Sequence, residues 1–188
     1  MVAGANGAGK STLTRLGREG FQSSAVLDPD AIAKSRQVTG ESDGSAIDAG
    51  REVLRRAEEL LAAKQSFLVE TTLSGNTYLR MMSRAKAAGY LVILLYVGTD
   101  DVTINLRRVR QRVRNGGHDV PEDDQLRRYP RSLANFKKAF DLADEALVFN
   151  NSTPLGHVRV AEKTKDGITI LGDVPQWAAF LRDQVSAV

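Results

Sequence analysis

The residues best suited to chemistry lie at the start of the chain, where residues 4–11 match the pattern Gly-x-x-x-x-Gly-Lys-Ser. The backbone N–H groups of such a loop can surround a phosphate, and Lys10 can reach the β- and γ-phosphates of a nucleotide. The hydroxyl of Ser11 is a ligand for Mg²⁺, which we expect as a cofactor. A chance glycine-rich turn before a helix is the alternative to this P-loop. The predicted nucleotide-binding residues are Gly4, Ala5, Asn6, Gly7, Ala8, Gly9, Lys10, Ser11 and Thr12.

Carboxylates follow two apolar runs that are typical of buried strands. Asp28 and Asp30 come after residues 26–27, and Glu70 comes after residues 67–69. Because ligands of open α/β sheets bind beyond the carboxyl ends of the strands, these acids are expected near a γ-phosphate. Transfer of that phosphoryl group to a hydroxyl requires a base, and we assign this role to Asp30. Helix capping is the alternative for Asp28 and Asp30, and a surface turn is the alternative for Glu70.

Arginines are concentrated in one segment. Residues 107–131 contain eight arginines and four acids, a net charge of +4 that leaves −1 for the rest of the chain. Helical spacing places Arg108 and Arg112 one turn apart, and a following helix carries Arg128 beyond a glycine pair. In a kinase such a helix pair would be a lid whose guanidinium groups neutralise charge in the transition state. A solvated helix face is the alternative.

Composition narrows the class of protein. The 188 residues, 42% of them hydrophobic, fit one globular domain, and the lack of cysteine excludes disulfides and thiol chemistry. No apolar run approaches the roughly 20 residues of a membrane span, so we expect a cytoplasmic protein with no membrane partner. Since the basic charge is confined to one segment with a single aromatic residue, no nucleic-acid partner is expected.

Short β-rich runs alternate with helical patterns along the whole chain, which is typical of a parallel sheet covered by helices. Strands are expected at 26–27, 67–69, 91–97 and 146–149, and a hairpin at 158–171. Helices are expected at 10–17, 45–64, 77–88, 102–114, 122–142 and 174–186. This predicts an α/β fold of P-loop NTPase type: a doubly wound, mostly parallel sheet with helices on both faces and an arginine-rich helical lid. Residues 1–188 are expected to form a single domain, with the lid at about 105–132 and a C-terminal hairpin and helix at about 156–186.

The strand that should precede the phosphate loop is short. Only Met1, Val2 and Ala3 come before Gly4, fewer than the ~5 residues of an ordinary strand. Either the chain begins late or this strand is a stub. Apolar residues added before Met1 are predicted to raise the melting temperature.

Five segments together resemble the zeta-toxin family of P-loop kinases, particularly its short stand-alone bacterial members. The resemblance covers nearly the whole chain up to about Ser152, and the order of the segments is more specific than the phosphate loop alone. The segments are residues 2–12, 27–33, 67–75, 112–121 and 128–133.

The resemblance implies a kinase that uses ATP or GTP, with Lys10 on the phosphates and Asp30 as the base. It implies that Glu70 and Thr72 hold the substrate, and that Arg112 and Arg128 clamp the transferring phosphoryl group. Asp28 and Arg51 are further candidates for substrate contact. The partners that it implies are a nucleotide sugar and an antitoxin protein.

The acceptor implied by the best-known family members is the 3′-hydroxyl of the sugar in UDP-N-acetylglucosamine. The chain departs from the family pattern at Ser74, where larger toxins carry arginine, and at Asn76. An antibiotic, a free sugar or a nucleoside therefore stays open as the acceptor. A nucleotide-binding regulatory ATPase is the alternative from a different functional class.

Overall fold

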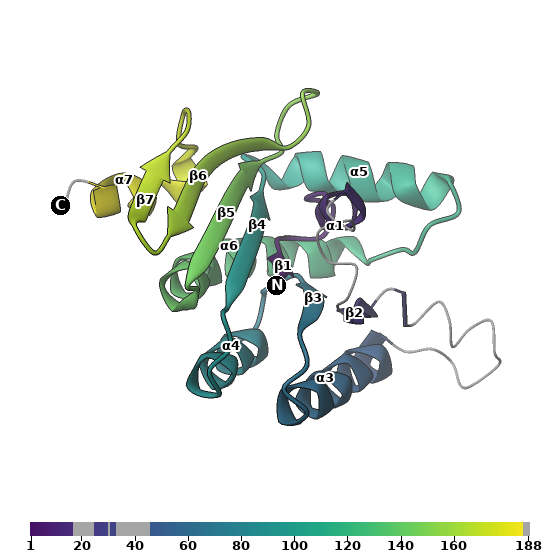
Figure 1. Cartoon of the computed structure of the whole chain (residues 1–188). Coiled ribbons are helices and arrows are strands. Elements are labelled where there is room, and N and C mark those ends of the chain that lie inside the picture. The colour runs from purple at the N-terminus through teal and green to yellow at the C-terminus, as the bar shows by residue number, and fades with distance from the viewer. Residues whose placement is uncertain (17–24, 30, 33–45, 186–188) are drawn as a thin grey trace.

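In the computed structural model, which describes residues 1–16, 25–29, 31–32 and 46–185, seven strands form one sheet (Figure 1). The strand order is β2-β3-β1-β4-β5-β6-β7, with β2 through β5 parallel and the last two strands antiparallel to their neighbours. The strands are β1 Val2–Ala3, β2 Ala25–Leu27, β3 Phe67–Thr71, β4 Ile93–Gly98, β5 Glu145–Asn150, β6 Val158–Thr164 and β7 Gly167–Ile170. The helices are α1 Lys10–Leu16, α3 Ala46–Ala62, α4 Thr77–Ala87, α5 Val102–Arg114, α6 Glu122–Leu142, η2 Gln176–Ala178 and α7 Phe180–Val185.

Helices cover both faces of this sheet because its central strands are apolar on both sides. On one face, buried side chains such as Ala3 and Tyr96 belong to a core that includes residues of α3, α4, α6 and α7. On the other face, Val2 and Leu95 pack with Leu13 of α1. Alternation of side chains along a strand explains why adjacent residues contribute to opposite cores. The predicted α/β, doubly wound fold is confirmed.

Aromatic side chains dominate the larger core. The rings of Tyr96 on β4 and Phe136 on α6 stack with centroids 4.0 Å apart and planes 14° apart. Trp177 lies against both rings, at 5.8 and 5.7 Å. This packing fixes α6, and with it the arginines that α6 carries, against the centre of the sheet.

Most element ends differ from the expected boundaries by one or two residues, and two of the differences have a visible structural form. Strand β4 begins at Ile93 rather than Leu91, because the backbone N–H and carbonyl of Val92 bond to Asp144 instead of continuing the ladder. The helix expected at 174–186 is divided into η2 and α7, which meet at Ala179. The C-terminal hairpin is confirmed, with the positive φ of its turn at Gly167.

The longest helix of the described residues, α6, carries charged side chains along its length. Within the ranges that the structure describes, no helix combines the length and the apolar character that crossing a membrane requires.

Candidate active site

A cleft of about 610 Å³ opens at the carboxyl ends of the parallel strands. Its walls come from the loop after β1, the ends of β2 and β3, the arginines of α5 and α6, and the segment after β5. In Figure 1 these parts lie around the start of α1. A volume of this size is typical of sites for small molecules.

The loop after β1 is shaped to hold an anion. Helix α1 begins at Lys10, so its first N–H groups and the positive end of its dipole face the loop. The ammonium of Lys10 donates a hydrogen bond to the carbonyl of Ala5, at 3.1 Å. All nine residues of the predicted nucleotide-binding run are described, and Asn6, Gly7, Gly9, Lys10, Ser11 and Thr12 line the cleft.

Two glycines of the loop are packed too tightly for any side chain. A β-carbon on Gly7 would lie 2.5 Å from the carbonyl oxygen of Asn105 in α5. A β-carbon on Gly9 would lie 2.4 Å from the amide nitrogen of Asn151. Both residues also have positive φ, of +76° and +108°, which favours glycine. The loop is therefore held against α5 on one side and the end of β5 on the other.

The end of β3 brings a carboxylate to the loop. Ser11 Oγ donates a hydrogen bond to Glu70 Oε2 at 3.0 Å, across 59 residues of sequence. Glu70 is only 5% exposed and lines the cleft, so its side chain is largely shielded from bulk solvent. The two groups that the sequence placed near the metal and the phosphates are in direct contact.

The turn after Glu70 is held in a strained conformation. Leu73 has φ of +54°, an unfavourable value for a residue with a branched side chain. Its N–H donates to Thr71 Oγ1 at 2.9 Å, and its carbonyl accepts from the Asn135 amide at 3.0 Å. The turn directs Thr72, which also lines the cleft, toward the same space as Glu70.

Three arginines of the helix pair reach the cleft: Arg108 and Arg112 from α5, and Arg128 from α6. Arg112 donates to the carbonyl of His118 at 2.8 Å, and Arg128 pairs with Asp124 at 2.7 Å. Partial burial, followed by the charge of Arg107, lowers the pKa of Arg108. These contacts hold Arg112 and Arg128 on the wall of the cleft that the phosphate loop also lines.

The segment after β5 contributes residues that the sequence analysis did not assign. The side-chain amide of Asn151 donates to the carbonyl of Ala8 at 2.7 Å, and His157 Nε2 lies 3.0 Å from the carbonyl of Gly9. Because a carbonyl only accepts, His157 donates through this nitrogen. Arg108 in turn donates to the carbonyl of Asn151 at 2.7 Å. Polar residues directly after an apolar strand were the signal that could have identified Asn151.

The remaining predicted residues are placed as follows. Asp28 lines the cleft, and its carbonyl accepts a hydrogen bond from the N–H of Ile32 at 3.0 Å. Asp30 lies outside the described residues, so its role as the base stays a prediction. Arg51 is not brought to the cleft: its side chain is 77% exposed and pairs with Asp48 at 3.3 Å.

The cleft has the chemical groups that a magnesium nucleotide requires. A hydroxyl and a carboxylate that already share a hydrogen bond, Ser11 and Glu70, form an all-oxygen donor set that suits Mg²⁺. Mg²⁺ keeps several waters and uses phosphate oxygens, so two protein ligands are sufficient. The helix start at Lys10 and the arginines supply the positive charge that polyphosphate needs.

Comparison with known proteins agrees with this geometry. A family model described as AAA domain matches residues 1–138. Over 130 residues the chain is 39% identical to an uncharacterized protein of Haemophilus influenzae. The aligned region covers 69% of this chain and 90% of that protein.

Solved structures with low sequence identity share the fold. The structure of AvrRxo1-ORF1:-ORF2 with ATP matches 97% of this chain at 16% identity, with a TM-score of 0.73. This chain spans 61% of that one. A structure from the PezAT chromosomal toxin-antitoxin system of Streptococcus pneumoniae matches at 17% identity and a TM-score of 0.59, covering 97% of this chain and 81% of that chain. The protein therefore has a P-loop kinase-like fold and belongs to the AAA domain family.

Proposed function

We propose that this protein is a kinase that transfers the γ-phosphoryl group of ATP or GTP to a hydroxyl group of a small molecule. The observation that carries the proposal is that one cleft contains the phosphate loop, the Glu70 carboxylate and three arginines. Phosphoryl transfer depends mainly on positioning and on stabilisation of charge, and these are the groups that supply both.

Each group has a role that follows from its position. Lys10 neutralises the β- and γ-phosphates, and Ser11 and Glu70 hold Mg²⁺, which when bound balances charge on the phosphate oxygens. Arg112 and Arg128 stabilise the phosphoryl group as it moves between donor and acceptor. Asp30, two residues beyond the cleft-lining Asp28, accepts the proton of the acceptor hydroxyl.

Room for an acceptor supports this proposal over a regulatory ATPase. The cleft extends from the phosphate loop past Glu70 and Thr72 to Tyr78, a partly buried side chain of α4. Burial raises the pKa of Tyr78, so its hydroxyl stays protonated and can donate a hydrogen bond to a ligand. A hydrolase would need only a water molecule at this place.

A nucleotide sugar is the acceptor that we favour, with UDP-N-acetylglucosamine as the first candidate. The resemblance to zeta toxins supports this choice, and the fold shared with the PezAT structure supports the resemblance. Antibiotics, free sugars and nucleosides are the competing acceptors, which the experiment below separates.

The test is incubation of the protein with Mg²⁺ and ATP or GTP in the presence of each acceptor class, followed by mass spectrometry. A gain of one phosphoryl group on UDP-N-acetylglucosamine is expected, and a gain on another compound would replace the favoured acceptor. Lys10→Ala should abolish both hydrolysis and transfer, whereas Asp30→Asn should bind nucleotide and lose transfer. Hydrolysis without transfer to any acceptor would indicate a regulatory ATPase.

An antitoxin is proposed as a protein partner on the same basis. The PezAT structure comes from a toxin-antitoxin system, and a kinase that modifies a nucleotide sugar would deplete a precursor of the cell wall. Expression of the chain alone should then arrest bacterial growth, whereas Lys10→Ala should not. Equal growth of cells that express the two forms would remove the reason for an antitoxin.

A further inference from the structure

Helix α3 carries a glycine at a position where a helix normally carries a side chain. Gly50 is the fifth residue of α3. Glycine is unfavourable in a helix interior, because it loses more backbone freedom on folding than any other residue. Positive φ and close neighbours explain the loop glycines Gly7 and Gly9, but Gly50 has neither within the described residues. A β-carbon on Gly50 would meet no heavy atom of those residues within 4 Å.

Gly50 belongs to the stripe of α3 that faces the sheet. Val53, Ala57 and Leu61 follow it at helical spacing, and their exposed fractions are 0%, 0% and 8%. A side chain at position 50 would therefore extend toward the sheet rather than into solvent. The space there is open, and Gly50 lines the cleft that holds the phosphate loop. The missing side chain thus leaves room at one wall of this cleft.

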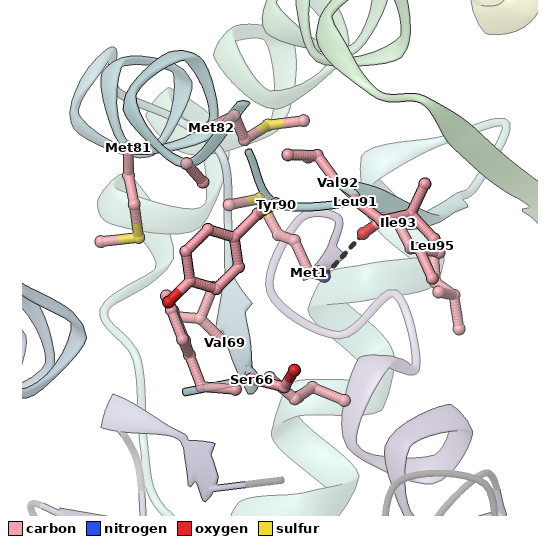
Figure 2. Close-up of a pocket in the computed structure, with 13 residues that line it drawn as sticks. Met1, Ser66, Val69, Met81, Met82, Tyr90, Leu91, Val92, Ile93 and Leu95 are labelled. Carbon is pink, nitrogen blue, oxygen red and sulfur yellow. Dashed lines mark hydrogen bonds between the residues drawn. The ribbon is translucent and has the colours of Figure 1, made fainter. Parts of the chain in front are cut away.

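Helix α4 lies beside α3 and begins at the same edge of the sheet. It follows β3 directly, so it starts at the carboxyl end of that strand, and Tyr78 is its second residue. Arg84 of α4 pairs with Glu58 of α3 at 2.6 Å. Tyr90, which follows α4 and is drawn in Figure 2, donates a hydrogen bond to the carbonyl of Leu60 in α3 at 3.1 Å. The two helices are therefore joined over their later turns.

The same contacts place Gly50 and Tyr78 at a similar level. Both helices return from the carboxyl edge of the sheet to its amino edge, so they run in the same direction. At about 1.5 Å per residue, Gly50 lies about 12 Å before Glu58, and Tyr78 lies about 9 Å before Arg84. Gly50 and Tyr78 thus stand at the cleft ends of adjacent helices, and both line the cleft.

The groups around this end of the cleft suit a ring that carries hydroxyl groups. Asp28 accepts hydrogen bonds, and the hydroxyl of Thr72, which lies 3.0 Å from Ser74 Oγ, can donate or accept. The ring of Tyr78 offers an apolar face for C–H groups, and its hydroxyl can donate. A sugar ring has this combination of C–H faces and polar edges.

The cavity at the other end of these helices lacks such groups. It measures about 380 Å³, and Figure 2 shows Met81, Met82 and Tyr90 beside it. Its walls are mostly apolar, and the Tyr90 hydroxyl is already bonded to α3. It lies at the amino ends of β3 and β4, at the opposite edge of the sheet from the phosphate loop. A hydroxyl-bearing acceptor of phosphoryl transfer therefore fits only the Gly50 end of the two helices.

We propose that a sugar ring of the acceptor lies in the space beside Gly50, against the ring of Tyr78, and that Gly50 determines which acceptors fit. Gly50 makes no bond of its own to the ligand, and its role is to leave the volume that the ring fills. The inference rests on the proposed function, since it assigns this part of the cleft to the acceptor.

The test fills this space in two steps, with Gly50→Ala and Gly50→Leu. Ala62→Leu, an exposed change at the last residue of α3 and outside the cleft, is the matched control. Alanine is more favourable than glycine in a helix, so Gly50→Ala should raise the melting temperature by about 1–4 °C. It should nevertheless weaken sugar binding about 10-fold, and leucine should weaken it about 100-fold or more. Opposite effects on stability and binding exclude general damage to the fold.

Binding is measured by calorimetric titration of the protein in the presence of Mg²⁺ and a non-hydrolysable analogue of ATP or GTP. UDP-N-acetylglucosamine, N-acetylglucosamine and uridine are the probes with a sugar ring, and chloramphenicol is the hydroxyl compound without one. Tyr78→Phe keeps the aromatic face and removes the hydroxyl, so it should weaken binding of the sugar probe about 3- to 10-fold. Nucleotide affinity should be unchanged in every variant.

The outcomes separate this inference from the proposed function. Parental affinity of Gly50→Ala for the sugar probe would overturn the inference even if the leucine variant did not fold. An equal loss in Ala62→Leu, or a parent chain that binds chloramphenicol alone or no probe, would also overturn it. Phosphoryl transfer by the Gly50 variants with the parental acceptor KM would refute the role of Gly50 and leave the kinase intact. Sugar binding that is weakened as expected, in a parent chain that transfers no phosphoryl group, would support the sugar site and refute the kinase.

Discussion

The side-chain amide of Asn151 donates a hydrogen bond to the carbonyl of Ala8 at 2.7 Å, across 143 residues of sequence. The contact is buried and joins the end of β5 to the phosphate loop. His157 makes a second contact of this kind at Gly9. The shape of the loop therefore depends on a distant segment as well as on its own glycines.

Replacement of Asn151 by alanine should weaken nucleotide binding. Loss of a buried hydrogen bond costs about 1–3 kcal/mol, which corresponds to roughly 5- to 150-fold in the dissociation constant if the whole loss falls on the bound state. Calorimetric titration with ATP or GTP measures it. Thr153→Ala, an exposed change in the same segment, is the matched control. Equal affinities of the Asn151 and Thr153 variants would show that the loop keeps its shape without this contact.

Replacement of Glu70 by glutamine should change the Mg²⁺ dependence of the activity and leave the fold intact. The glutamine carbonyl can still accept the hydrogen bond from Ser11, so the local geometry should persist while the negative charge is lost. We expect phosphoryl transfer to fall by about 100-fold or more and the Mg²⁺ concentration for half-maximal activity to rise. Titration of activity with Mg²⁺ checks both effects. Parental Mg²⁺ dependence in this variant would exclude Glu70 from the metal site.

Substitution of both Arg112 and Arg128 by alanine should lower turnover far more than nucleotide affinity. Arginines that act mainly in the transition state contribute about 10³–10⁵ to the rate, and little to ground-state binding. Steady-state kinetics combined with nucleotide titration distinguishes the two effects. Arg127→Ala is the control, because Arg127 pairs with the same Asp124 as Arg128 and is exposed outside the cleft. An equal loss of turnover and affinity would contradict a role in the transition state.

The free energy of unfolding of the chain with a free amino group at Met1 should increase with pH between about 5 and 8. The buried amino group of Met1 has a pKa of about 5 in the folded protein and 8.0 as its ordinary value. Between these values the unfolded chain binds a proton that the folded chain does not, so the free energy of unfolding rises with pH. The full difference is on the order of 4 kcal/mol as an upper bound.

Denaturant unfolding at several pH values measures this slope, and an Nα-acetylated form of the protein provides the control. Acetylation removes the titrating group, so the part of the slope due to Met1 should disappear. If the modified and unmodified chains show the same profile, the amine is solvated in the folded state.

Local patterns in the sequence predicted most of the architecture. The glycine-rich run predicted the phosphate loop and the start of α1. Glycines that can adopt positive φ, followed directly by a helical pattern, are compatible with few other local structures. Apolar runs followed by acids placed Glu70 at the end of a strand, and parallel topology then brought it to Ser11. Helical spacing was sufficient to place Arg108 and Arg112 on the same side of α5.

What could not be predicted depends on contacts between distant segments. Asn151 and His157 acquire their partners only because β5 ends beside the loop. The polar run after this strand could mark Asn151 as a candidate, but it does not indicate which residues Asn151 and His157 contact. The later start of β4 has a similar origin, because the Asp144 carboxylate takes the N–H of Val92. Arg51 is a predicted candidate that lies away from the cleft in the structure. Helical periodicity could not indicate whether its face of α3 meets the cleft.

The backbone of Asn105 lies so close to Gly7 that no side chain fits between them, and the amide of Asn105 is buried and bonded to Thr99. The phosphate loop and the first turn of the arginine-bearing helix α5 consequently share one packed junction. Their mutual alignment is achieved when the chain folds, so the associated loss of entropy is incurred once and not again in each reaction cycle. A substitution of Asn105, which does not line the cleft, is therefore expected to slow the proposed phosphoryl transfer without removing a contact to a ligand.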